Sequence, residues 1–209
     1  LTILIAVLPF IAAKKGGQNS KTDFLRPVLL FLLLGAGFMI LEVSLIQRFI
    51  LFLGSPVISM SVFLITLFIG MSLGSFYTNR FTDNGIGYKI GLYAIIIGAV
   101  IIAYSMLLPN LFRFLIGYDF IIRVIAAAML ILPLGFLLGI PFPSGIRLLK
   151  QKEKGFLIPW MWGINGAASV LGSVLAVAVA IMAGFTSAQF ISAGCYLFIG
   201  FLYLNRADN

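Results

Sequence analysis

One carboxylate lies inside a long apolar run, and it is the residue of this chain with the strongest claim to polar chemistry. Glu42 falls within the segment GAGFMILEVSLIQR, residues 35–48. A carboxylate at membrane depth costs about 3 kcal/mol on insertion scales, so something in the fold must compensate for it. The other acidic residues fall in predicted loops, at loop edges or in the tail: Asp23, Asp83, Asp119, Glu153 and Asp208. Two roles stay open for Glu42: binding of a cation or proton, and a structural hydrogen bond between helices.

Helical geometry indicates which side chains could partner Glu42. Gly35 lies on the same helix face as Glu42, seven residues earlier, which favours a close approach of another helix at that face. Counted from Arg26, Glu42 lies about 24 Å along the helix, in the outer half of the membrane. Arg123, at the outer start of a later helix, is therefore the expected ionic partner. The candidate intramembrane polar site consists of Glu42, Gln47, Arg48, Arg123 and Asn165.

The composition indicates a membrane protein and excludes several kinds of active site. The chain is 62% hydrophobic and 10% charged, whereas soluble domains are about 25% charged. It has no histidine, the commonest metal ligand and general base, and its one cysteine, Cys195, lies inside an apolar run. It also lacks nucleotide-binding glycine motifs and Cys clusters. We therefore expect no catalytic residue, no metal site and no cofactor in this chain, and no nucleic-acid partner despite the net charge of +8.

The apolar runs predict an all-α, polytopic membrane helix bundle with seven transmembrane helices. The first is expected to end near Ala13, as the end of a helix that begins before Leu1, and residues 1–26 then comprise this helix end and a basic cytoplasmic linker. A six-helix membrane domain is expected over 27–209. Its predicted helices cover residues 27–53, 56–77, 88–108, 120–140, 159–183 and 187–204.

Proline and glycine determine several of these predicted ends. The fourth predicted helix stops before Pro109. The fifth stops at the segment 139–145, which holds two prolines and two glycines, and a basic loop is expected over 147–154.

The distribution of basic residues predicts an orientation. With the linker before Arg26 placed inside and the helices alternating, eleven cations fall on the cytoplasmic side and three on the outer side. This asymmetry satisfies the positive-inside rule and predicts an outer N-terminus and a cytoplasmic C-terminus. The outer cations are Arg48, Arg113 and Arg123; the cytoplasmic ones are Lys14, Lys15, Lys21, Arg26, Arg80, Lys89, Arg147, Lys150, Lys152, Lys154 and Arg206.

Small residues predict where helices pack closely, because they let helix backbones approach in a membrane. The third predicted helix ends with a GxxxG motif, Gly70 to Gly74. In the sixth, small residues recur every three or four positions and predict a packing seam along one face. The seam consists of Gly166, Ser169, Ser173, Ala176 and Ala180. Asn165 lies beside it, where its amide could either bond a neighbouring helix or line a cavity.

Three segments together resemble a known family. They are LLGAGFMILEVSLIQRFILFLGSPVISMSVFLITLFIGMSLGSF, LGFLLGIPFPSGIRLL and IPWMWGINGAASVLGSVLAVAVAIMAGF. They are similar to the C-terminal membrane region of bacterial spermidine-synthase-like integral membrane proteins, which join membrane helices to a soluble Rossmann-type, aminopropyltransferase-like domain. The last six helices further resemble half of a major facilitator transporter, although Asn79 stands where that superfamily has an acidic residue.

The resemblance implies a location and a function. The chain is expected in the bacterial inner membrane, where it would anchor a soluble domain that is not part of these residues and pass it a cationic or lipophilic substrate. Any aminopropyltransferase activity would then belong to that soluble domain. The expected partners are the lipid bilayer and either the soluble Rossmann-type domain or other membrane subunits. Two alternatives stay open: a transporter-like half without enzyme activity, and an accessory structural subunit of a larger membrane complex.

Overall fold

A computed structural model describes residues 21–82 and 84–205, and this described part consists of helices and short connections, without strands. The helix expected to end near Ala13 lies outside the described residues. The elements are α2 (Lys21–Leu53), α3 (Pro56–Tyr77), η1 (Thr78–Arg80), α4 (Ile86–Leu115), α5 (Phe120–Leu138), α6 (Pro141–Gln151), η2 (Gly155–Leu157) and α7 (Ile158–Leu204).

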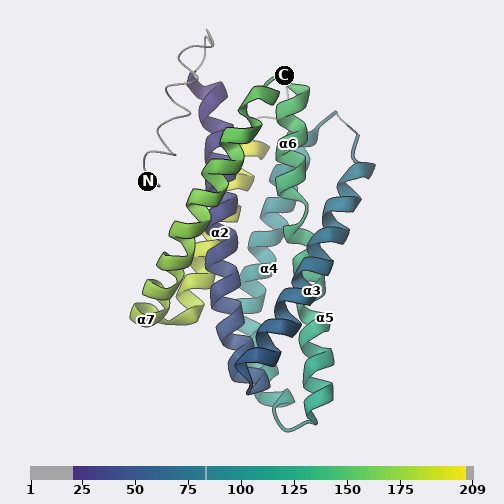
Figure 1. The fold of residues 1–209 in the computed structure, drawn as a ribbon, viewed down its shortest axis with the longest axis vertical. Helices are drawn as coiled ribbons and strands as arrows, with labels where there is room; N and C mark the ends of the chain where they lie inside the picture. The colour runs from purple at the N-terminus through teal and green to yellow at the C-terminus, as the bar shows by residue number, and fades with distance from the viewer. Residues whose placement is uncertain (1–20, 83, 206–209) are drawn as a thin grey trace.

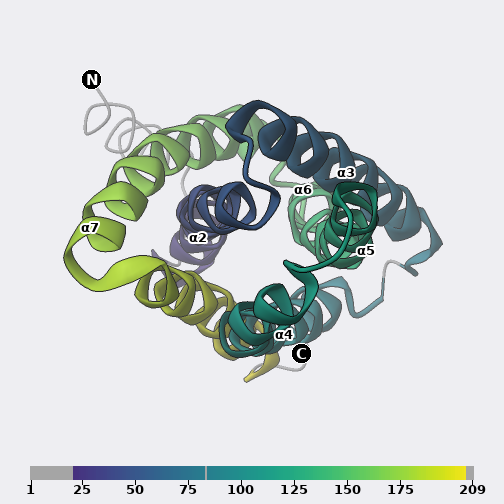
Figure 2. The same ribbon diagram turned by 90° about the horizontal axis from the view of Figure 1, so that it is seen from below.

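The helices run up and down the long axis of the molecule as one bundle (Figure 1). Seen along that axis, α2 lies inside a ring formed by α7, α4, α5 and α3 (Figure 2). Five helical segments of the described part are long and apolar enough to cross a membrane. This agrees with the predicted all-α membrane bundle. Large apolar side chains also cover its outer surface, for example Leu51, Ile65 and Met182, as expected for helices that face lipid.

The two last predicted helices form one element, α7, which folds back on itself. Gly184 interrupts it with φ 84° and ψ 165°, and the chain then returns toward the end where α7 began (Figure 1). Ala176 and Ala188 accordingly pack in one cluster with Ile40 of α2, although they lie on opposite sides of the turn. The predicted spans 159–183 and 187–204 correspond to these two arms.

Alanine at Gly184 is expected to destabilise the protein by about 2 kcal/mol. The reason is that a side chain is strained at this positive φ with extended ψ, a region that is nearly restricted to glycine. The control is Gly194→Ala on the second arm, an exposed helical position where an added methyl group meets nothing within 4 Å. Chemical unfolding in detergent measures the difference, and equal midpoints for the two variants would show that the turn tolerates a side chain.

Two helices extend past the prolines that were expected to bound them, whereas α5 ends at Leu138, at the break predicted from the segment 139–145. Pro109 lies inside α4, which continues to Leu115, and Pro27 lies inside α2. Pro141 begins α6, so the break after α5 is short and the expected basic loop from Arg147 is helical as far as Gln151. Pro141 fits there because a proline in the first helical turn lacks only an N–H that has no partner within the helix.

The order of the helices gathers the basic residues at one end of the bundle. The start of α2, the α3–α4 and α6–α7 connections and the end of α7 lie at this end, together with α6 (Figure 1). We call it the basic end. The described cations of these segments are Arg26, Arg80, Lys89, Arg147, Lys150, Lys152 and Lys154. Arg48, Arg113 and Arg123 lie near the opposite end, so the charge separation expected from sequence is present in the fold.

Glycines bring α3 and α5 into backbone contact. A Cβ at Gly70 would lie 2.6 Å from the carbonyl oxygen of Leu132, and one at Gly135 would lie 2.7 Å from that of Leu67. One turn further on, a Cβ at Gly74 would overlap the Phe136 carbonyl oxygen. The GxxxG motif of α3 therefore packs against a second motif of the same spacing, Gly135 to Gly139, at the end of α5.

The predicted seam on α7 is only partly correct. Gly166 is exposed with nothing within 4 Å of an added Cβ, and Ser173 and Ala180 are half-exposed. The row that faces the bundle is Asn165, Ala168, Gly172 and Ala176, with Gly172 against Ala36 of α2. Small residues occur on several faces of this arm, so their spacing alone could not identify the face that α2 covers.

Candidate functional site

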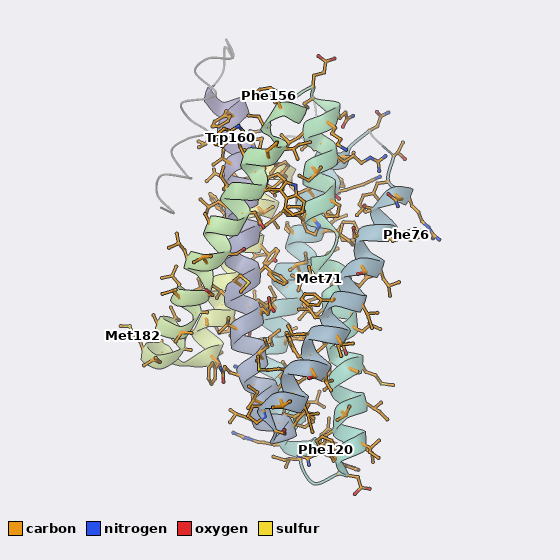
Figure 3. All side chains as sticks on the ribbon, in the orientation of Figure 1. Met71, Phe76, Phe120, Phe156, Trp160 and Met182 are labelled. Atoms are coloured by element: carbon orange, nitrogen blue, oxygen red, sulfur yellow. The ribbon has the colours of Figure 1, made fainter. Side chains whose placement is uncertain are left out.

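An open groove of about 1050 Å³ runs along the bundle in the described part of the protein. It lies between α2, α3, the α5–α6 region and the first arm of α7. Met71 lines it near mid-height of the bundle, and Phe76 lines it nearer the basic end (Figure 3). The groove therefore extends from the basic end to about the middle of the molecule.

The wall of the groove combines apolar side chains with a few polar ones. Phe142, at the start of α6, and Trp162, near the start of α7, meet edge to face at 4.8 Å between ring centres. The other apolar residues are Leu34, Phe38, Met39, Met71, Phe76, Leu138, Pro143, Ile146 and Tyr196. The polar ones are Ser72, Ser75, Thr78, Asn79, Arg147, Lys150, Asn165 and Ser169.

Two cations of α6 lie where the groove meets the basic end. Arg147 is half-buried and donates from Nη1 to the carbonyl oxygen of Thr78 at 3.0 Å, which holds α6 against the end of α3. Lys150 is exposed one turn further along α6. An anionic group at this position would be attracted by both side chains.

Asn165 joins the groove to the α2–α7 contact. Its amide Nδ2 donates to the carbonyl oxygen of Phe31 at 2.9 Å, so it makes an interhelical hydrogen bond. Its backbone lies directly against Gly35, where a Cβ would overlap the Asn165 carbonyl oxygen. It also lines the groove. The two roles that the sequence left open for this residue, an interhelical hydrogen bond and a place in a cavity wall, are therefore both present.

Glu42 lies one turn beyond Phe38, on the α2 face that lines the groove. Its side chain is half-buried. In the described part of the protein it has neither an ion pair nor a hydrogen bond, and it is not among the residues that line the groove. Helix spacing thus places the carboxylate just past the inner end of the groove.

Arg123 does not pair with Glu42. Its Nη1 donates to the carbonyl oxygen of Phe52 at 3.0 Å, ten residues and about 15 Å along α2 from Glu42. The reason is that α5 meets the last turn of α2, where carbonyl groups lack helical partners and an arginine can satisfy them. The expected ion pair is therefore incorrect.

Arg48 and Gln47 differ in their surroundings. Arg48 is 8% exposed and reaches from α2 to Thr186 Oγ1 at 2.5 Å and to the Ser105 carbonyl oxygen at 3.4 Å. Gln47 is exposed. The five sequence-derived candidates therefore do not form one site: Asn165 lines the groove, Glu42 lies beside it, and the others lie toward the opposite end.

Most residues of the groove and one buried amide were not among the candidates predicted from the sequence. Ser72 and Ser75 near the end of α3 and Asn79 in η1 follow one another at three- and four-residue spacing, and this polar row was a signal of a non-lipid face. Gln189 of α7 is fully buried, and neither its Nε2 nor its Oε1 has a hydrogen-bond partner in the described part. A glutamine inside an apolar run carries the same kind of signal as Glu42.

Comparison of the chain with protein-family models, with curated proteins and with solved structures found no match.

Proposed function

We propose that this chain is the membrane domain of a spermidine-synthase-like protein, and that its groove holds a lipophilic ligand with an anionic head group for a soluble domain at the cytoplasmic face. The observation that carries the proposal is the groove itself, which joins two cations of α6 to an apolar wall that reaches the middle of the bundle. A ligand with an anionic head group and an apolar chain matches both the cations and the apolar wall.

The charges of the groove favour a lipophilic anion over the cationic substrate that the sequence left open. A polyamine would meet Arg147 and Lys150 at the basic end before it reached any carboxylate. Glu42 lies beyond the lining residues and faces no described cation. Like charges at the entrance disfavour a cation by electrostatic repulsion, and the largely apolar wall offers it few ligands.

The proposed orientation puts the basic end at the cytoplasm, in the bacterial inner membrane. This follows from the positive-inside rule applied to the cations gathered there. A soluble domain at the cytoplasmic face would then lie at the open end of the groove, where a ligand could pass between the two without crossing the membrane.

A bulky residue at Ser169 is expected to block ligand binding. Ser169→Phe adds a ring inside the groove, whereas Ser173→Phe adds the same ring one turn away at a position that does not line it. The readout is quenching of Trp162, which lines the groove, by a fatty acid with a brominated chain, in protein with Trp160→Phe so that Trp162 is the remaining tryptophan. We expect the saturable part of the quenching to disappear in Ser169→Phe and to persist in Ser173→Phe.

The cationic alternative gives a different result in the same experiment. If spermidine displaced the brominated fatty acid, or if Ser169→Phe bound it as tightly as the parent protein, the proposed lipophilic ligand would be incorrect. Unchanged thermal unfolding of both variants in detergent is the check that neither ring disturbs the fold.

A transporter-like half is the second candidate, because the groove is open along the bundle and a second bundle could close it. Exposed apolar residues lie in its wall on α3 and beside it on α7, for example Phe76 and Val170 respectively. In that case, Ser169→Phe would also reduce assembly with the second bundle, which the mass of the purified complex would report.

A further inference from the structure

A second cavity, of about 420 Å³, lies at the end of the bundle opposite the basic end. Six of its nine lining residues are apolar, and the other three are Arg48, Arg113 and Thr186. They come from the end of α2, the end of α4 and the turn of α7. The lining residues are Arg48, Leu51, Phe52, Pro109, Phe112, Arg113, Ile116, Phe185 and Thr186.

Arg48 is a buried cation without a described counter-ion. Only 8% of its surface is exposed, and its hydrogen-bond acceptors, Thr186 Oγ1 and the Ser105 carbonyl oxygen, are uncharged. No described carboxylate lies within ion-pair distance of it. Because an uncompensated buried charge is strongly unfavourable, an anion in the adjoining cavity would stabilise this arrangement.

Two more arginines add positive charge at the same place. Arg113 is exposed and lines the cavity. Arg123 reaches its wall from α5 by donating to the Phe52 carbonyl oxygen, and its Nε has no described hydrogen-bond partner. The ring of Phe52 stacks on Phe112 at 4.2 Å between ring centres, and the two rings form part of the cavity wall between α2 and α4.

We propose that this cavity binds the phosphate of a phospholipid, with Arg48 and Arg113 as its cationic ligands. The planar guanidinium fork matches phosphate oxygens and binds them with charge-assisted hydrogen bonds. A lipid fits better than free phosphate because the rim is apolar and open: Leu51 is 71% exposed and Ile116 is 56% exposed. Acyl chains would cover these side chains while the head group reaches the arginines.

This site is separate from the groove. It lies at the other end of the bundle and shares no lining residue with it. Failure of either proposal would therefore leave the other standing.

The test measures thermal unfolding of the whole chain in an uncharged, phosphate-free detergent with three added probes. They are dihexanoyl phosphatidylglycerol, inorganic phosphate and dihexanoylglycerol, which has the same acyl chains without phosphate. We expect only the phospholipid to raise the unfolding temperature in a saturable way. Arg113→Gln should weaken this binding about tenfold, the usual effect of losing one charge-assisted hydrogen bond.

Matched variants separate a specific site from general attraction of lipid to a basic protein. Arg80→Gln removes an exposed arginine at the basic end and should leave the affinity unchanged. Arg48→Lys keeps the charge, loses the fork and should weaken binding as Arg113→Gln does. If Arg48→Lys fails to fold, Arg113→Gln is sufficient for the test, because Arg113 is exposed.

Three results would overturn the proposal. Parent-like affinity in Arg113→Gln would exclude this arginine as a ligand. An equal effect of inorganic phosphate would assign the site to a free anion, and an equal effect of dihexanoylglycerol would show that the phosphate is not recognised.

Discussion

Alanine in place of Gly74 or Gly139 is expected to lower the free energy of unfolding by about 3 kcal/mol, the upper part of the usual range for overpacking. An added Cβ at Gly74 would overlap the carbonyl oxygen of Phe136, and one at Gly139 would overlap that of Met71. These are backbone atoms of the facing helix, so they cannot move aside as the end of a flexible side chain could. The α3–α5 contact, which forms one wall of the groove, would have to open.

Gly166→Ala is the matched control for these two variants. Gly166 is also helical, but an added Cβ there meets nothing within 4 Å. Alanine should stabilise this position by up to about 1 kcal/mol, because glycine is a poor helix former. Denaturation in mixed detergent measures the free energy of unfolding of all three variants. If alanine changed it in the same direction at Gly74 and at Gly166, the close contact at Gly74 would be contradicted.

Leucine at Gly172 is expected to destabilise the protein by about 3 kcal/mol or more, since it would separate α7 from α2. A Cβ at Gly172 would lie 2.7 Å from the Ala36 carbonyl oxygen and 2.9 Å from its Cα, before the rest of the leucine side chain is placed. The α2–α7 contact is the most extensive between helices in the described part, so its loss affects the whole bundle.

Ser173→Leu, the neighbouring substitution, is expected to be nearly neutral. Ser173 is half-exposed, and its hydroxyl donates to the carbonyl oxygen of Val170 on its own helix at 2.8 Å. Unfolding of the two leucine variants under the same conditions identifies the face of α7 that meets α2. A larger loss for Ser173→Leu would support the seam predicted from sequence and contradict the structure.

The candidate site illustrates why sequence reasoning succeeded for single residues and failed for their partners. Counting residues along the predicted helices places both Glu42 and Arg123 in the outer half of the membrane. This shared depth was the only reason to expect them to pair. Depth follows from the rise along one helix, but a partner depends on which face of which helix lies opposite. The structure brings Arg123 to Phe52 and leaves Glu42 beside the groove.

Sequence by itself determined the helical class, the position of most membrane helices and the separation of charge between the two ends. These properties are local or additive: lipid has no hydrogen bonds to offer a backbone, so long apolar runs become helices, and each connection carries its own charge. Even the turn at Gly184 falls in the gap between two predicted helices, 159–183 and 187–204.

Only the tertiary structure decided which faces of the helices meet. Small residues surround the first arm of α7, and Gly172 rather than Gly166 contacts α2 because of how the helices are arranged about α2. The groove and the arginine cavity arise in the same way, from residues of three or more helices that no spacing along the chain connects. In a membrane, apolar residues face both lipid and protein, so hydrophobic periodicity does not distinguish the two.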